Sequence, residues 1–266
     1  IFSSGEAFAA LKENGNALYW GKRSMADPGD AFGNASFNIK NIYSTLYGFA
    51  ALKTDGSVVT WGTEGDGFAS KRYLDKYSLN KELSSGVIEI AATDRSFAAI
   101  KEDGSIYAWG HGTNRHWHQL PKQGAKKIFA SNSGFAAILE DGSVFAWGYG
   151  FQPHKHYPSL ELNGQLKEHL SSDVIEIISS ATGFAALKND GSAIAWGPDQ
   201  GKAIANGVKK IVAIHNSFAA LKEDGSIVSW GKGNYRHEEV KEHLENNCIN
   251  LFSDGGSFYA LKEDGS

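Results

Sequence analysis

The fold of this chain is decided by one stretch, which reads SFAAIKEDGSIYAWG over Ser96–Gly110. Its first part, SFAAIK, is apolar on both faces, which suits a strand buried on both sides. The pair Asp103–Gly104 then predicts a tight hairpin turn with positive φ at both residues. The segment IYAWG returns as a second strand, and the alternation of Ile88–Ile90 indicates a further strand upstream. The stretch therefore predicts a small antiparallel sheet.

The stretch occurs in seven copies, each anchored by a phenylalanine. The anchors are Phe8, Phe49, Phe97, Phe135, Phe184, Phe218 and Phe258. A tryptophan stands twelve residues after the anchor in six copies: Trp20, Trp61, Trp109, Trp147, Trp196 and Trp230. Successive anchors are 41, 48, 38, 49, 34 and 40 residues apart, so the cores keep their length while the connections vary. This pattern is typical of stacked repeats.

A small sheet with two apolar faces cannot bury both of them alone. Radial stacking of seven such sheets hides these faces and leaves only short, protected edges, which is the architecture of a β-propeller. We therefore expect an all-β fold, a seven-bladed β-propeller of short antiparallel sheets that forms a single domain over 1–266. The Phe and Trp side chains should fill the space between sheets, and paired alanines such as Ala50 and Ala51 should let backbones crowd near the central axis.

The two ends of the chain carry a further expectation. The seventh copy stops at Ser266, about four residues before the strand that would carry its tryptophan. The chain begins at Ile1, inside the first copy, without a methionine or a signal-peptide pattern. We expect an incomplete last blade in this chain, which would be a fragment of a longer protein.

Composition and motifs argue against several classes of function. A net charge of −4 gives no sign of the clustered basic face that nucleic-acid binding needs. No apolar stretch approaches about 18 residues, so we expect no membrane insertion. The single Cys248 excludes an intramolecular disulfide framework and a zinc site of several thiolates. The sequence has no nucleophile elbow, phosphate loop or dinucleotide fingerprint, so we expect no enzymatic activity and no cofactor.

Three connections end in similar segments just before a copy of the repeat. They read LNKELSSG (79–86), LKEHLSSD (166–173) and VKEHLENN (240–247). We predict short amphipathic turns of helix that shield a sheet edge, with binding of a partner as the alternative.

In a rigid scaffold the variable connections carry function. The connections after the third and fourth copies (111–126 and 149–165) hold five of the nine histidines. Because they follow equivalent strands, we expect both to emerge on the same side. Exposed Trp, Tyr and Arg dominate binding hot spots, and the alternative is that these side chains fold back over the blade edge. The predicted contact residues are Arg115, His116, Trp117, His118, Tyr149, Phe151, His154, His156 and Tyr157.

These two connections also contain two His-x-His pairs, His116 with His118 and His154 with His156. In an extended strand both imidazoles of a pair lie on one side, and imidazole suits zinc, copper or nickel. Neither pair includes an acidic residue or a thiolate. We therefore predict no metal site and keep metal binding as an alternative.

The pattern Φ-x5-[GS]-F-A-A-L-K-x-D-G-S-x3-W-G resembles the repeat of the regulator of chromosome condensation family, in a bacterial-type variant. The resemblance extends over all seven copies. It implies a seven-bladed propeller that acts by protein contact, since members include exchange factors for small GTPases and protein inhibitors of β-lactamases. The family motif is structural and implies no catalytic residue here. The Gly-Gln-Leu-Gly pattern usual in the eukaryotic branch is missing after the Trp-Gly pairs, and only Asn163–Leu166 is similar to it.

We therefore expect a non-enzymatic protein–protein interaction module, a monomeric propeller that binds another protein through loops on one face. One alternative is a guanine nucleotide exchange factor or an effector that acts on a small GTPase. The other is an architectural repeat domain of a large bacterial surface protein. A secreted or surface-attached bacterial protein, or a secreted effector, is favoured over a cytoplasmic one.

Overall fold

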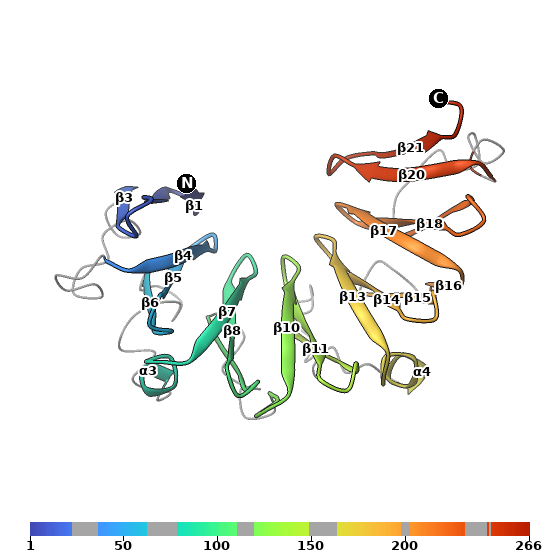
Figure 1. The fold of residues 1–266 in the computed structure, drawn as a ribbon. Helices are drawn as coiled ribbons and strands as arrows, with labels where there is room; N and C mark the ends of the chain where they lie inside the picture. The colour runs from blue at the N-terminus through green and yellow to red at the C-terminus, as the bar shows by residue number, and fades with distance from the viewer. Residues whose placement is uncertain are drawn as a thin grey trace, which may run out of the picture. The chain divides into compact units, whose positions relative to one another are not determined.

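The computed structural model describes residues 1–22, 37–62, 79–110, 120–148, 164–197, 203–231, 244 and 246–266. These residues form two compact units, Ile1–Ala130 and Ser131–Ser266, most of whose elements are labelled in Figure 1. The expectation of a single domain over 1–266 stays a prediction.

The described part of the first unit contains three three-stranded sheets, one further strand and a short helix. Its elements are β1 (Phe2–Ser3), β2 (Ala7–Leu11) and β3 (Ala17–Gly21); β4 (Ile39–Ser44), β5 (Gly48–Lys53) and β6 (Val58–Gly62); α3 (Leu79–Glu82); β7 (Val87–Ala92), β8 (Ser96–Lys101) and β9 (Ile106–Gly110); and β10 (Ala125–Ala130). The predicted strands and hairpins are thus confirmed in this unit.

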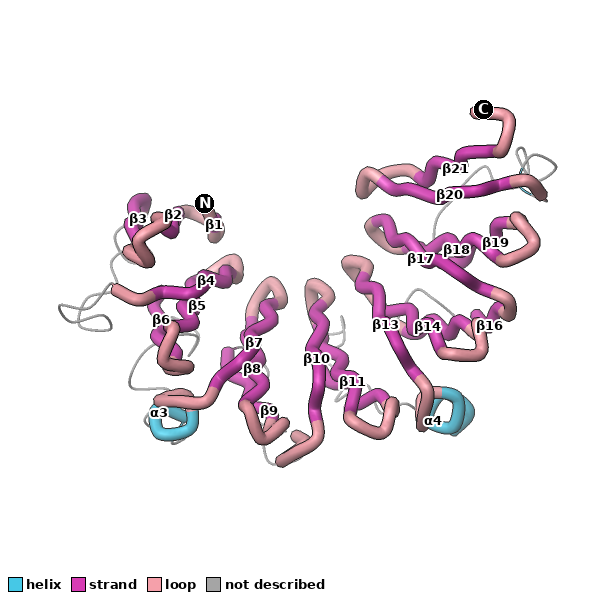
Figure 2. Tube along the Cα trace, in the orientation of Figure 1, coloured by secondary structure: helices cyan, strands magenta, loops and turns pink. Residues whose placement is uncertain are grey.

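The second unit repeats the same plan. Its elements are β11 (Gly134–Leu139) and β12 (Val144–Gly148); α4 (Gly164–His169); β13 (Val174–Ser179), β14 (Phe184–Lys188), β15 (Ala193–Trp196) and β16 (Ala203–Ala205); β17 (Val208–Ile214), β18 (Ser217–Lys222) and β19 (Ile227–Gly231); and β20 (Cys248–Ser253) and β21 (Phe258–Lys262). Strand β16 adds a fourth strand to one sheet, and β20 and β21 form a sheet of two strands. Within each sheet, strands that follow one another in the chain are hydrogen-bonded neighbours (Figure 2).

The repeated aromatic residues fill the space between sheets, as predicted. Phe97 lies opposite Trp109 in the register of β8 and β9, and their rings stack with centroids 5.4 Å apart. Both side chains are fully buried. In the first copy the same pair stacks, but Phe8 and Trp20 are 42% and 45% exposed. These two residues belong to the face that in later copies packs on the preceding sheet.

Neighbouring sheets pack opposite faces against each other. In the first unit Ala50 and Leu52 on one face of β5 join a core cluster with Phe97 and Trp109 of the next sheet. Ala51 lies on the other face of β5, in the cluster shared with the preceding sheet. The paired alanines therefore let neighbouring sheets approach face to face. The expectation that they crowd near a central axis stays a prediction. They lie on the middle strand, whereas the first strands of neighbouring sheets contact one another.

The hairpin turns differ in one respect from the prediction. Gly104 has a φ of 74°, but Asp103 does not have a positive φ. The Gly104 N–H donates to the Lys101 carbonyl at 2.8 Å, and the Lys101 N–H donates to the Ser105 carbonyl at 3.0 Å. This is a type I turn followed by a glycine bulge, which needs a left-handed residue at one position only. The Asp103 carboxylate accepts bonds from the Ser105 N–H and Oγ, at 2.9 and 2.6 Å, and so holds the turn.

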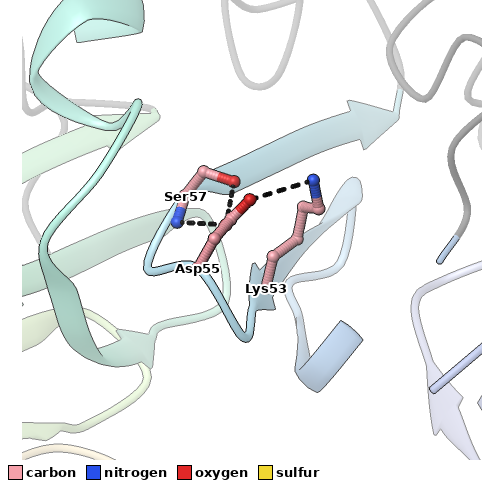
Figure 3. A network of polar contacts seen from close by, with 3 residues as sticks. All are labelled: Lys53, Asp55 and Ser57. Carbon is pink, nitrogen blue, oxygen red and sulfur yellow. Dashed lines mark hydrogen bonds and ion pairs between the residues drawn. The ribbon is translucent and has the colours of Figure 1, made fainter. Parts of the chain in front are cut away.

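Figure 3 shows the same network in the second copy. Asp55 Oδ1 accepts hydrogen bonds from the Ser57 N–H at 2.9 Å and the Ser57 Oγ at 2.6 Å, and Lys53 Nζ lies 3.4 Å from Asp55 Oδ2. The bonds from Ser57, followed by the nearby Lys53 charge, lower the pKa of Asp55. Because the network recurs from copy to copy, its role is to shape the turn.

The turn also connects each sheet to the next one. The Gly104 carbonyl accepts a hydrogen bond from the Ala125 N–H at 3.0 Å, and the Gly56 carbonyl accepts one from Val87 at 2.9 Å. A Cβ at Gly104 would lie 2.4 Å from the backbone nitrogen of Gly124. Glycine is therefore required at this turn both for its φ and for the close approach of the next sheet.

Two of the three predicted helical segments are present and shield a sheet edge, as predicted. After α3, the Leu83 carbonyl accepts a hydrogen bond from the Val58 N–H on the edge strand β6 at 2.8 Å. After α4, the Leu170 carbonyl accepts the equivalent bond from Val144 of β12 at 2.9 Å. Most of the third segment, 240–247, lies outside the described residues.

Over the described ranges, the structure contains no helix that is long and apolar enough to cross a membrane.

Candidate interaction face

All the predicted contact residues lie in 111–119 and 149–163, outside the described residues. They are Arg115, His116, Trp117, His118, Tyr149, Phe151, His154, His156 and Tyr157. Their grouping, and the alternative of a metal site on the two His-x-His pairs, stay predictions. In the described part of the chain, no three His, Cys, Asp or Glu residues are grouped so that they could hold a metal ion.

The strands before these two loops show where each loop begins. Gly110, the last described residue before 111–119, is paired with Ser96. Gly148, before 149–163, is paired with Gly134. Ser96 and Gly134 each follow the turn between the first and second strands of a repeat. Each loop therefore leaves its sheet at the end that carries this turn, opposite the Asp-Gly hairpin.

A buried hydroxyl holds each of these turns together. Thr93 Oγ1 accepts hydrogen bonds from the Arg95 N–H at 3.2 Å and the Ser96 N–H at 2.9 Å, and it donates to the Ser96 carbonyl at 3.3 Å. The equivalent residues in three other copies are Thr45, Ser131 and Ser180. Sequence reasoning missed these residues, although their signal is simple. A Ser or Thr stands four residues before the anchor phenylalanine.

Backbone hydrogen bonds tie the turns of neighbouring sheets side by side. In the first unit the Gly5 N–H donates to the Leu46 carbonyl at 3.0 Å, and the Leu46 N–H donates to the Asp94 carbonyl at 2.8 Å. In the second unit the Ala181 N–H donates to the His215 carbonyl at 2.8 Å. We call these joined turns the turn rim: residues 3–6, 45–47 and 93–95 in the first unit, and 131–133, 180–182, 214–216 and 254–256 in the second.

The turn rim of the first unit carries large side chains. Leu46 is 44% exposed, and Tyr47 beside it is half-buried. The guanidinium of the exposed Arg95 lies 5.5 Å from the centre of the Tyr47 ring, so the cation stacks on an aromatic side chain of the neighbouring sheet. Partial burial raises the pKa of Asp94, and the neighbouring Arg95 charge opposes this shift. The result is a mixed apolar and charged patch.

The turn rim of the second unit carries smaller side chains, such as Asn132, Ser133 and Ala181, and one imidazole, His215. In its last turn a carboxylate replaces the hydroxyl. Asp254 Oδ1 accepts bonds from the Gly256 and Ser257 N–H groups, at 3.0 and 2.9 Å, and Oδ2 accepts one from the Tyr259 hydroxyl at 2.7 Å. The bond from Tyr259, followed by the two backbone bonds, lowers the pKa of Asp254.

No protein-family model matches the sequence, and no curated protein matches it significantly. Among solved structures, human WBSCR16 is 14% identical with a TM-score of 0.52, over 86% of this chain and 75% of that chain. The CRINKLY WD40 ectodomain of the Arabidopsis thaliana receptor kinase ACR4 is 15% identical with a TM-score of 0.50, over 94% and 84% of the two chains. Prp20p of Saccharomyces cerevisiae, the yeast RCC1, is 16% identical with a TM-score of 0.48, over 86% and 70%.

At these identities the likeness concerns the fold, and the bacterial-type variant of the repeat stays a prediction. Together with the recurring antiparallel sheets, the likeness leads to one conclusion. The chain has an all-β propeller fold.

Proposed function

We propose that this chain is a non-enzymatic protein-interaction module, which binds another protein through the turn rim and the loops that leave the sheets beside it. One observation carries the proposal. In the first unit the exposed Leu46 and Arg95 flank Tyr47 at the sheet end from which loop 111–119 departs. Arg and Tyr are enriched among residues that dominate binding energy, and an aliphatic neighbour adds apolar area.

The geometry of the patch supports a binding role. Stacking on Tyr47 restricts the Arg95 side chain while it stays exposed, so less rotamer entropy is lost on binding. The turn beneath is fixed by Thr93 and by the bond from Leu46 to Asp94. Loop 111–119 would add Arg115, Trp117 and the histidines beside them. Loop 149–163 would contribute its aromatic residues in the second unit.

The test is an affinity capture with the purified chain, followed by titration of the captured protein against variants. We expect Arg95→Ala with Leu46→Ser to weaken binding about tenfold or more, because both change exposed hot-spot residue types. Trp117→Ala with Tyr157→Ala should also weaken it. Glu102→Ala lies in the same repeat as Arg95, at the opposite hairpin, and serves as the control. A partner that binds all variants like the wild type would place the site elsewhere and refute the proposal.

The exchange-factor alternative rests on the resemblance of the repeat alone. It requires that the chain accelerate release of a fluorescent guanine nucleotide from a small GTPase. Binding of a partner without such acceleration would leave the interaction module and exclude exchange activity on that GTPase. The architectural alternative requires that no partner be captured. A secreted or surface-attached location is proposed on the same resemblance.

A further inference from the structure

The hairpin of the first repeat differs from the other six in its chemistry. Six copies carry Asp-Gly-Ser at the hairpin position, and the first carries Asn14–Gly15–Asn16. Two further Asn-Gly pairs, at 163–164 and 206–207, lie outside the hairpins. Glycine has no side chain that would hinder attack of its backbone nitrogen on the preceding carboxamide, so Asn-Gly is especially prone to spontaneous deamidation. The first hairpin is therefore a candidate site of covalent modification.

The Asn14 side chain is exposed, and a hydrogen bond holds it close to the backbone that follows it. Asn14 Oδ1 accepts this bond from the Asn16 N–H at 3.1 Å. The arrangement is an Asx-turn, which folds the carboxamide back toward the backbone nitrogen of Gly15. The bond also polarises the carboxamide C=O group, so the carbon that would be attacked is both close to the nucleophile and activated.

Hydrogen bonds of the hairpin protect the Gly15 nitrogen while the sheet stays closed. The Gly15 N–H donates to the Lys12 carbonyl at 3.0 Å, and the Lys12 N–H donates to the Asn16 carbonyl at 2.8 Å. These bonds close the first sheet, in which Leu18 and Trp20 on one face are 51% and 45% exposed. A segment with few buried apolar contacts opens locally at a low free energy. We therefore expect local opening of this hairpin to release the Gly15 N–H for reaction.

We propose that Asn14 is a site of spontaneous deamidation in the folded chain, and that its product is aspartate rather than isoaspartate. The Gly15 nitrogen gives its proton to solvent and attacks Asn14 Cγ, and the new C–N bond closes a succinimide ring. The Cγ–Nδ2 bond breaks, and the amide group leaves as ammonia with a proton from solvent. Water then opens the ring. Addition at Cγ restores the ordinary backbone with an aspartate side chain, whereas addition at the backbone carbonyl carbon gives isoaspartate.

Contacts with the next sheet favour the ordinary backbone at this turn. Isoaspartate would insert the Cβ carbon of residue 14 into the main chain and lengthen the turn. The Gly15 carbonyl accepts a hydrogen bond from the Ile39 N–H at 2.9 Å, and a Cβ at Gly15 would lie 3.5 Å from Asn38 Cα. A longer turn cannot keep this bond together with the two bonds between Lys12 and the hairpin. Because isoaspartate can close the ring again, the folded chain should accumulate aspartate, the isomer that keeps these contacts.

The other hairpins show that this turn accommodates aspartate. Asp55 Oδ1 accepts a hydrogen bond from the Ser57 N–H at 2.9 Å, as Asn14 Oδ1 does from Asn16. The bonds from Ser57 contribute most to lowering the pKa of Asp55. An ionised carboxylate resists attack by a backbone nitrogen, so an aspartate held in this way does not readily close the ring again. Deamidation would therefore give the first hairpin the residue that the other six copies already have.

The test is peptide mapping by mass spectrometry after the purified chain is incubated at mildly alkaline pH. Electron-transfer fragmentation distinguishes aspartate from isoaspartate, and Asn14→Asp provides the reference peptide for aspartate. One sample stays folded, and a second is unfolded in urea. We expect the peptide that contains residue 14 to gain the mass of an amide-to-acid exchange in both samples. Aspartate should exceed isoaspartate in the folded chain. Isoaspartate should exceed aspartate in urea, because an unconstrained succinimide opens preferentially at the backbone carbonyl.

Matched variants assign the reaction to one residue. Asn14→Gln should abolish the mass gain, because the longer side chain closes a ring far more slowly. Asn16→Gln keeps the backbone N–H that bonds to Asn14 Oδ1 and should react like the wild type. The proposal fails if the folded chain shows no mass gain at residue 14 once the urea sample is fully converted. Isoaspartate as the main product in the folded chain would equally overturn it.

Discussion

At the scale of single residues, the aspartate of each Asp-Gly-Ser turn is a titratable part of the fold. Asp224 accepts hydrogen bonds from the Ser226 Oγ and N–H, at 2.5 and 2.9 Å, and from Lys222 Nζ at 3.2 Å. The bonds from Ser226 contribute most, and the pKa of Asp224 falls from 3.8 to about 2. A carboxylate whose pKa is lower in the folded chain stabilises the fold above its unfolded pKa, and this contribution is lost as the pH falls through the folded value.

We therefore expect the wild type to lose stability between about pH 4 and pH 2, and Asp224→Asn to lose less over this range. The measurement is the midpoint of urea unfolding as a function of pH. Glu223→Gln removes a negative charge at the preceding residue, which takes no part in this network. Its unfolding midpoint should change with pH as the wild-type midpoint does. If the unfolding midpoints of Asp224→Asn and the wild type change equally with pH, this aspartate does not couple folding to protonation.

At the scale of elements, a hairpin position can require glycine for a local reason, its positive φ, and for a long-range reason, the close approach of the next sheet. Gly104 and Gly191 have similar φ values, 74° and 77°. A Cβ at Gly104 would lie 2.4 Å from the Gly124 nitrogen, whereas at Gly191 the nearest atom of the next sheet would be 3.5 Å away. Each substitution by alanine carries the cost of a left-handed residue, about 1–2 kcal/mol. Gly104→Ala adds a clash with the following sheet.

We expect Gly104→Ala to destabilise the chain by about 1–3 kcal/mol more than Gly191→Ala does, because backbone atoms must move apart. Urea unfolding of the two variants measures this difference. Equal losses would mean that φ alone sets the requirement and that the close approach of sheets adds nothing.

At the scale of the whole molecule, stability should be distributed between neighbouring sheets. In repeat architectures each repeat contacts only its neighbours, so a cavity weakens the adjacent interfaces first. Trp109 is fully buried in the cluster between the second and third sheets, whereas Trp20 is 45% exposed. Trp109→Ala should cost about 3–5 kcal/mol, and Trp20→Ala clearly less.

Hydrogen exchange followed by mass spectrometry tests the distribution. Trp109→Ala should speed exchange in β4–β9 and leave β17–β21 close to the wild type. Equally faster exchange in all these strands would show that the sheets unfold as one cooperative body, against the nearest-neighbour expectation.

Much of the fold follows from the sequence because its signals are local. The strand pattern, the position of every hairpin and the stacking of Phe97 on Trp109 depend on residues within one short repeat. The helical segments at 79–86 and 166–173 could likewise be predicted from their amphipathic pattern. The loop residues from Arg115 to Tyr157 were predicted only from residue type, and their role stays a prediction.

The features that only the tertiary structure decided depend on which chain segments become neighbours. The close approach of the Gly104 turn to the Gly124 backbone of the next sheet is one such feature. The turn rim exists because Leu46 bonds to Asp94 across two sheets, and Arg95 finds Tyr47 there. Local periodicity fixes each strand, whereas contacts between sheets depend on residues that are distant in the chain.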